Sequence, residues 1–100
     1  MNQKQATICE AIKTKHLIRL FYTEGYRTVE PHCLGEAKTG NILLRAFQIR
    51  GSSKSLEFKG WKLFNIDEII SLSIHDDCFE RPRHGYNPND PEFVRIICRL

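Results

Sequence analysis

With 100 residues, of which 41% are hydrophobic and 27% are charged, this chain has the size and composition of one soluble globular domain. Its formal net charge of +3 permits a polyanionic partner but is smaller than a dedicated duplex-binding domain usually carries. The first ten residues lack the apolar core of a signal peptide, and no apolar run approaches the ~20 residues of a membrane-spanning helix. We therefore expect a cytoplasmic protein without membrane contact.

The first part of the chain predicts one helix and a hairpin. Within residues 6–16, the i, i+3, i+4, i+7 spacing of a helix is followed by Ile8, Ala11, Ile12 and Lys15, and Thr7 is the expected N-cap. The period then changes, because residues 17–22 form a β-rich run that is followed by a glutamate–glycine turn. Residues 27–30 return as a second strand, which we expect to end at Pro31.

Three further strands follow a turn at residues 38–41. Residues 42–49 form the strongest strand, and because both of its faces are largely apolar, we expect it to be covered on both sides. Residues 51–55 have the composition of a flexible loop. Residues 58–65 predict the next strand, and residues 70–75 alternate apolar and polar side chains, which is typical of a half-buried strand.

The C-terminal part predicts an irregular loop and then a helix. Residues 81–91 contain three prolines and a glycine, which exclude a helix or a central strand. A short helix should begin with Asp90 as N-cap and Pro91 at its first position. Its apolar stripe would consist of Phe93, Ile96, Ile97 and Leu100.

Together these elements predict a mainly β fold with short flanking helices (α+β). Short antiparallel strands at close spacing favour a small, strongly bent sheet or a partly open, strongly bent β-barrel, with an N-terminal helix and a short C-terminal helix. We expect a single domain over residues 1–100, with a core over about 8–80 and the C-terminal loop and helix over 81–100.

Residue types that carry redox, metal or acid–base chemistry occur without a motif. The cysteines share no short spacing, nothing selects among their three pairings, and in a reducing compartment we expect free thiols at Cys9, Cys33, Cys78 and Cys98. Residues 32–33 and 75–78 contain zinc-ligand types but lack paired CxxC or HxxxH spacings. We therefore expect no metal, no cofactor and no enzymatic activity. A pocket that joined Cys33 or Cys78 to a histidine would favour an enzyme instead.

Three segments resemble the WYL domain, a small SH3-like (Sm-like) β-barrel of bacterial regulators and defence-linked proteins. They are Arg27-x-Val29-Glu30-Pro31, residues 40–47, and Trp61-Lys62-Leu63-Phe64-x-Ile66-Asp67-x-Ile69. The family's Trp-Tyr-Leu falls on Ile42-Leu43-Leu44, and its basic residue after the strand aromatic falls on Lys62. The resemblance implies such a barrel, and a role in sensing a ligand and regulating transcription.

The candidate site combines cations, one large aromatic ring and polar groups. Its residues are Arg27, Glu30, His32, Arg45, Gln48, Trp61 and Lys62. Cations would contact phosphate, Trp61 would stack on a base, and Gln48 would meet polar edges. Two structural alternatives stay open: Arg45 and Glu30 form an internal ion pair, or Trp61 belongs to the core. As strand neighbours, Trp61 and Lys62 face opposite sides of the sheet, so both reach one ligand only at a bulge or at a sheet edge. Otherwise another residue, such as Arg45, must take over either the stacking or the phosphate contact.

We expect a non-enzymatic module that binds single-stranded nucleic acid or a nucleotide-like anion. The alternative is a protein-interaction module, either a homo-oligomer or the accessory partner of a separately encoded protein. Open sheet edges and the C-terminal apolar stripe would then supply the interface.

Overall fold

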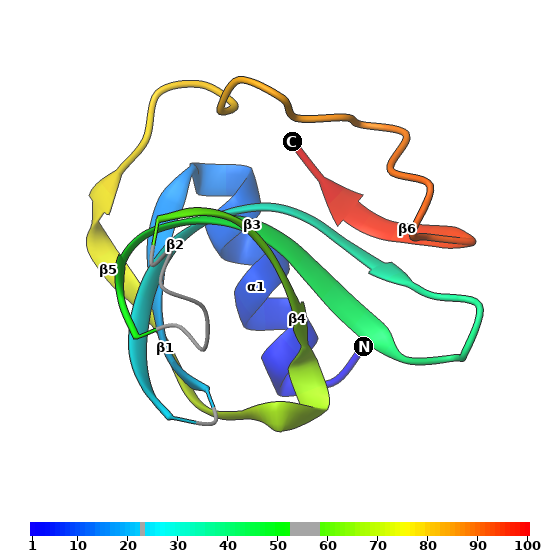
Figure 1. The fold of residues 1–100 in the computed structure, drawn as a ribbon, viewed down its shortest axis with the longest axis horizontal. Helices are drawn as coiled ribbons and strands as arrows, with labels where there is room; N and C mark the ends of the chain where they lie inside the picture. The colour runs from blue at the N-terminus through cyan, green and yellow to red at the C-terminus, as the bar shows by residue number, and fades with distance from the viewer. Residues whose placement is uncertain (23, 53–58) are drawn as a thin grey trace.

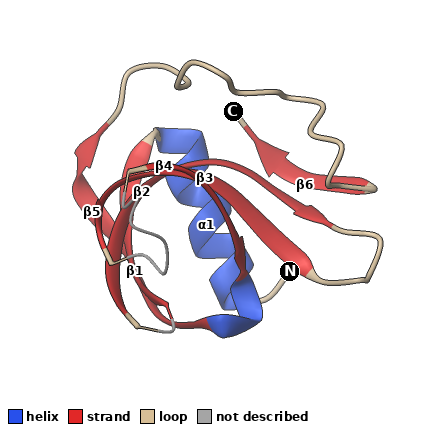
Figure 2. Ribbon diagram, viewed as in Figure 1, coloured by secondary structure: helices blue, strands red, loops and turns tan. Residues whose placement is uncertain are grey.

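The computed structural model describes residues 1–22, 24–52 and 59–100. Its described elements, shown in Figures 1 and 2, are α1 (Gln3–Thr14), β1 (His16–Tyr22), β2 (Gly25–Glu36), β3 (Ile42–Gly51), β4 (Gly60–Asn65), the 3-10 turn η1 (Ile66–Glu68), β5 (Ile69–Cys78) and β6 (Arg95–Arg99). No helix within these described ranges has the length and apolar character needed to cross a lipid bilayer.

The strands form one curved antiparallel sheet that packs against α1 (Figure 1). Their order is β4-β3-β2-β1-β5, with β6 paired to the distal part of β2. Within the described residues, β4 and β5 lie at opposite ends of this order and do not pair with each other. The prediction of a mainly β fold with an N-terminal helix is confirmed, and the strongly bent sheet is open and does not close into a barrel.

The helix begins three residues before the predicted start. Asn2 is its N-cap, because its side chain accepts a hydrogen bond from the Gln5 amide at 2.8 Å, and Thr7 lies inside the helix. Lys15 is the C-cap of the helix. It adopts a left-handed conformation with φ of 57° and donates its amide to carbonyls of the last turn. The expected N-cap at Thr7 is therefore wrong.

The second strand continues beyond the predicted stop. β2 runs through Pro31 to Glu36, and its pairing with β3 shifts register between Pro31 and Cys33. This bulge leaves His32 outside the β2–β3 ladder, while Pro31 stays opposite Ala46 beside it, and a residue without an amide proton is tolerated next to such an irregularity. The strands predicted at 17–22, 42–49 and 70–75 are confirmed with modest shifts at their ends, and β4 confirms the described part of the strand predicted at 58–65. Part of the loop predicted at 51–55 lies outside the described residues.

The prediction of a C-terminal helix is wrong, because Arg95–Arg99 form strand β6. β1 pairs with residues 25–29 of β2 and leaves the same edge of β2 open at residues 33–36. β6 pairs there, and the amide of Val94 also donates to the carbonyl of Glu36. Residues 79–94, which we call the strap, cross from β5 to β6 without helix or strand (Figure 2), which confirms the irregular segment that the prolines predicted up to about residue 90.

The core lies between α1 and the sheet. Ile8, Ala11 and Ile12 of the helix pack against apolar side chains of five strands and η1, among which Phe64 is only 1% exposed. A disulfide between Cys9 and Cys98 joins the helix to β6. The prediction of four free thiols is therefore wrong for this pair, whereas Cys33 and Cys78 are free, the first buried and the second exposed.

Candidate functional site

The predicted site residues lie on two faces of the sheet. Trp61 is paired with Phe47, and Lys62 with Ala46, so the two neighbours lie on opposite faces as the alternation predicted. The core face carries Arg27, Gln48 and Lys62. The outer face, which the strap covers, carries Glu30, His32, Arg45 and Trp61. The structure does not bring the seven residues together around one ligand.

Arg27 and Gln48 form a buried pair on the core face. The Arg27 side chain is 6% exposed, and its Nη1 donates to Gln48 Oε1 over a long 3.4 Å. The rings of Tyr22 and Phe64 lie 5.3 and 5.5 Å from the guanidinium carbon, at cation–π distance. Burial lowers the pKa of Arg27, against the opposing effect of nearby Tyr22 and an acidic residue. Both side chains are separated by the sheet from Trp61.

His32 connects the sheet to the strap on the outer face. Its ring is fully buried, and Nε2 accepts the backbone amide proton of Arg83 at 3.1 Å. An accepting Nε2 carries no proton, so Nδ1 is protonated and donates to the carbonyl of Glu30 at 2.8 Å. Burial lowers the pKa of His32, and the imidazole is neutral in this arrangement.

Both charged residues of the outer face pair with the strap. Glu30 accepts two hydrogen bonds from Arg83, at 2.8 and 3.2 Å, and the Arg83 guanidinium lies 4.6 Å from the centre of the Phe47 ring. Arg45 donates through Nε to Asp90 at 2.8 Å. The alternative in which Arg45 pairs with Glu30 is therefore wrong. Each charge has its own partner, about 50 residues further along the chain.

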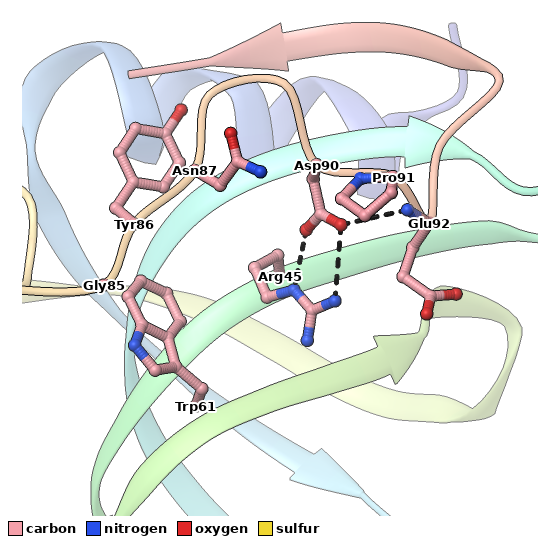
Figure 3. Close-up of a pocket in the computed structure, with 8 residues that line it drawn as sticks. All are labelled: Arg45, Trp61, Gly85, Tyr86, Asn87, Asp90, Pro91 and Glu92. Atoms are coloured by element: carbon pink, nitrogen blue, oxygen red, sulfur yellow. Dashed lines mark hydrogen bonds and ion pairs between the residues drawn. The ribbon is translucent and has the colours of Figure 1, made fainter.

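A pocket of about 240 Å³ opens between the strap and the sheet. Figure 3 shows the residues that line it: Arg45, Trp61, Gly85, Tyr86, Asn87, Asp90, Pro91 and Glu92. The rings of Trp61 and Tyr86 border one side, and the Arg45–Asp90 ion pair borders another (Figure 3). The pocket therefore offers aromatic faces next to hydrogen-bonding groups, as small-molecule sites commonly do.

The two aromatic rings of the pocket lie close together with nearly parallel planes. The Trp61 and Tyr86 planes are within 23° of parallel, and their centroids are 6.5 Å apart. His32 is 4.7 Å from Trp61 and 5.2 Å from Tyr86, so the three centroids form a triangle and His32 lies beside the pair. Trp61 Nε1 donates to the carbonyl of His84 at 3.2 Å. We call the Trp61–Tyr86 pair the aromatic slot. Trp61 is only partly buried there, so it is not a plain core residue.

The strap supplies the residues that sequence reasoning left out of the site. Arg83 contacts His32 and Glu30, Tyr86 lies beside His32 and Trp61, and Asp90 pairs with Arg45. The signal was the strap's composition, since Arg81 to Tyr86 combines cations with an aromatic residue, and a structured loop of that kind packs on a nearby surface. Its pairing partners were not readable, because nothing in sequence spacing relates residue 83 to residue 30.

The described residues also include side-chain types that bind metals or act as nucleophiles. No group of three His, Cys, Asp or Glu side chains there is placed to hold a metal ion. Burial, followed by the charge of Asp90, raises the pKa of the Cys33 thiol to about 11, so this thiol is protonated near neutral pH.

Comparison with protein-family models, with curated proteins and with solved structures finds no significant match to this chain. The resemblance to the WYL domain stays a prediction that rests on the three segments quoted above. The function must therefore be argued from the geometry of the slot and its surroundings.

Proposed function

We propose that the protein is a non-enzymatic binding module whose ligand presents one planar heterocyclic ring, as a nucleotide or a single-stranded nucleic acid does. The observation that carries this proposal is the spacing of the aromatic slot. Stacked bases are separated by about 3.4 Å, so a ring inserted between two others needs centroids about 7 Å apart. Trp61 and Tyr86, at 6.5 Å and 23°, come near this spacing, and one ring enters between them if the two rings separate and His32, 4.7 and 5.2 Å from their centroids, moves aside.

The charges around the pocket decide which part of such a ligand enters. Arg45 is 25% exposed, but Asp90 already neutralises it, and Glu92 adds a second carboxylate to the lining. A phosphate inside this lining would meet more negative than positive charge. The base therefore occupies the slot, and the phosphate lies outside, where the strap presents the exposed Arg81; Arg83, like Arg45, is already paired with a carboxylate.

The fold proposal has two supports besides the resemblance. An N-terminal helix precedes a meander of antiparallel strands, and the fifth strand returns to pair with the first. We propose that this open sheet is a variant of the SH3-like (Sm-like) architecture that the WYL resemblance implies. The same resemblance suggests a regulatory role, in which ligand occupancy of the slot would be the sensed event.

Fluorescence of the single tryptophan tests the slot directly. Adenosine monophosphate and short oligonucleotides should quench Trp61, because a base stacks on its ring. Base–aromatic stacking contributes about 1–3 kcal/mol, so Tyr86→Leu should weaken binding by about 5- to 150-fold. Tyr26→Leu is the matched control, because Tyr26 is 48% exposed and does not line the pocket. Absence of quenching, or equal weakening in both variants, would refute the proposal.

Salt distinguishes the two forms of ligand. An oligonucleotide that contacts the strap cations should lose affinity as salt rises, because bound counterions are released. A nucleoside without phosphate should bind with little salt dependence. Salt-independent oligonucleotide binding would remove the nucleic-acid form of the proposal and leave the base-binding form.

A second candidate function is self-association through the open edge of β5. This strand pairs with β1 alone within the described residues, and Ile70 and Ile74 on it are 71% and 39% exposed. Residues 70–74 read Ile-Ser-Leu-Ser-Ile, which is the same in both directions. An antiparallel pairing of two copies centred on Leu72 would therefore match apolar with apolar and Ser with Ser.

Sedimentation at increasing protein concentration checks this second candidate. A dimer that Ile74→Lys abolishes, and that the exposed control Val94→Lys preserves, is the expected result. A monomer at millimolar concentration would count against it. The C-terminal stripe predicted as an interface has lost its basis, because its residues lie on no helix and several pack against the core.

A further inference from the structure

The hydrogen bond between His32 and the strap lies directly behind the aromatic slot. His32 Nε2 accepts the Arg83 amide, and the next residue, His84, accepts the indole proton of Trp61 through its carbonyl. Gly85 and Tyr86 then line the pocket. We infer that His32 is a pH-operated latch, and that protonation of Nε2 releases the Arg83 amide and frees strap residues 83–86 to move away from Trp61.

Protonation is incompatible with the observed contact. A protonated Nε2 is a donor, and the Arg83 amide is also a donor, so the 3.1 Å approach becomes repulsive. The fully buried ring has no water to take over the bond, and Nδ1 already donates to the Glu30 carbonyl. The imidazolium therefore requires that the strap move or that the ring become hydrated.

The charged groups around His32 come from two elements. Glu30 on β2 favours the imidazolium, and the Arg83 guanidinium on the strap opposes it. The remaining neighbours are the rings of Trp61 on β4 and of Phe79 and Tyr86 on the strap. Burial raises the pKa of the Tyr86 phenol, so this ring carries no charge in the acidic range. Because burial is the largest influence on the pKa of His32 and lowers it, the latch opens below the ordinary histidine range of about 6.5.

The strap is built to transmit a local release to the slot. Its two ion pairs, Glu30–Arg83 and Arg45–Asp90, hold it on either side of residues 84–87. Gly85 has φ of +92°, and an added Cβ would lie 3.1 Å from Trp61 Nε1. This glycine joins the latch to Tyr86, so a shift of the Arg83 backbone changes the spacing of the two rings while both ion pairs persist.

Amide hydrogen exchange at residues 83–86 between pH 7.5 and 5.0 tests the latch without any ligand. After correction for the intrinsic rate, we expect protection to fall by up to about 30-fold, because pH 5.0 lies about 1.5 units below the ordinary histidine pKa of about 6.5. His32→Gln keeps an acceptor and cannot titrate, so its protection should not change with pH. His84→Gln is the matched control: its ring is exposed, and it should retain the wild-type response.

Nuclear magnetic resonance of the wild-type protein supplies a second readout if His32→Gln does not fold. The His32 ring should carry its proton on Nδ1 at pH 7.5, and the Arg83 amide resonance should shift with the same midpoint as the ring. Titration of His32 without movement of the Arg83 amide would overturn the inference. Persistence of the exchange response in His32→Gln would do the same.

Control of ligand binding by the latch rests additionally on the proposed function. Adenosine monophosphate titrated at pH 7.5 and 5.5 separates the two ideas. If no binding occurs at either pH while exchange still responds to His32, the proposed function fails and the latch stands. If binding occurs with the same affinity at both pH values in wild type and in His32→Gln, and exchange is unchanged, the latch fails and the proposed function stands.

Discussion

The Cys9–Cys98 disulfide closes a loop across 89 positions, almost the whole chain. A cross-link stabilises the folded state mainly by restricting the unfolded chain, by about 2.1 + 1.5R ln n cal/mol/K for a loop of n residues. For a loop of this length the restriction is about 4.6 kcal/mol at 25 °C. Domains of this size have unfolding free energies of about 5–15 kcal/mol. Reduction should therefore remove a large share of the stability.

Urea unfolding followed by Trp61 fluorescence measures this loss. We compare the oxidised protein, the protein with a phosphine reductant, and the double variant Cys9→Ala/Cys98→Ala. With an m-value of about 1.5 kcal/mol per molar, the midpoint should fall by about 3 M in both altered samples. Cys78→Ser is the control, because Cys78 is exposed and unpaired, and it should change stability by less than about 0.5 kcal/mol.

The reasoning would be refuted by a reduced protein whose unfolding free energy stays within about 0.5 kcal/mol of the oxidised value. Thiol titration must first show two thiols before reduction and four afterwards, as the bonded pair and the two free cysteines require. Four thiols in the protein purified without reductant would contradict the disulfide itself.

Three further predictions concern the core and the strap. Phe64→Ala should lower the unfolding free energy by about 3–5 kcal/mol because the ring is 1% exposed, whereas Tyr26→Ala, at a 48% exposed position, should cost less than about 1 kcal/mol in the same urea series. Glu30→Gln should cost about 1–3 kcal/mol, because a buried carboxylate loses its ion pair, and the more exposed Glu36→Gln less than about 0.5 kcal/mol; equal losses would contradict this assignment. Burial raises the pKa of Asp90, but the guanidinium and backbone donors that it accepts from outweigh burial and hold it below its ordinary value. Its stabilising contribution should be present above about pH 4 and be lost as the pH falls through the folded-state pKa, so Asp90→Asn should flatten the acid limb of the stability curve.

Local alternation and turn residues were sufficient to place most of the strands. The apolar run at 42–49 and the alternation at 70–75 report a backbone period of two, which depends on a few neighbouring residues. A pattern over a few neighbouring residues does not identify the C-terminal strand, because the apolar stripe of this segment also fits a helical period. Its β-branched residues, such as Ile96 and Ile97, favour a strand, and the open edge of β2 decided between the two.

The division of the candidate site between two faces was also partly contained in the sequence. Strand alternation alone places Trp61 opposite to Lys62, and the structure confirms it. The same alternation says nothing about which face the strap covers. The position of the strap across the sheet places Tyr86 beside Trp61. It also pairs Arg45 with Asp90 rather than with Glu30.

By itself, the sequence determined the N-terminal helix, the main strands, the irregular strap and the opposite orientation of Trp61 and Lys62. These features follow from backbone geometry within a few residues. Tertiary structure decided the open sheet, the return of β6, the Cys9–Cys98 bond and the contact of His32 with the strap. Each of these features joins segments that are distant along the chain. Which segments pair depends on the strand edges and buried polar groups that remain unpaired after the rest of the sheet has formed.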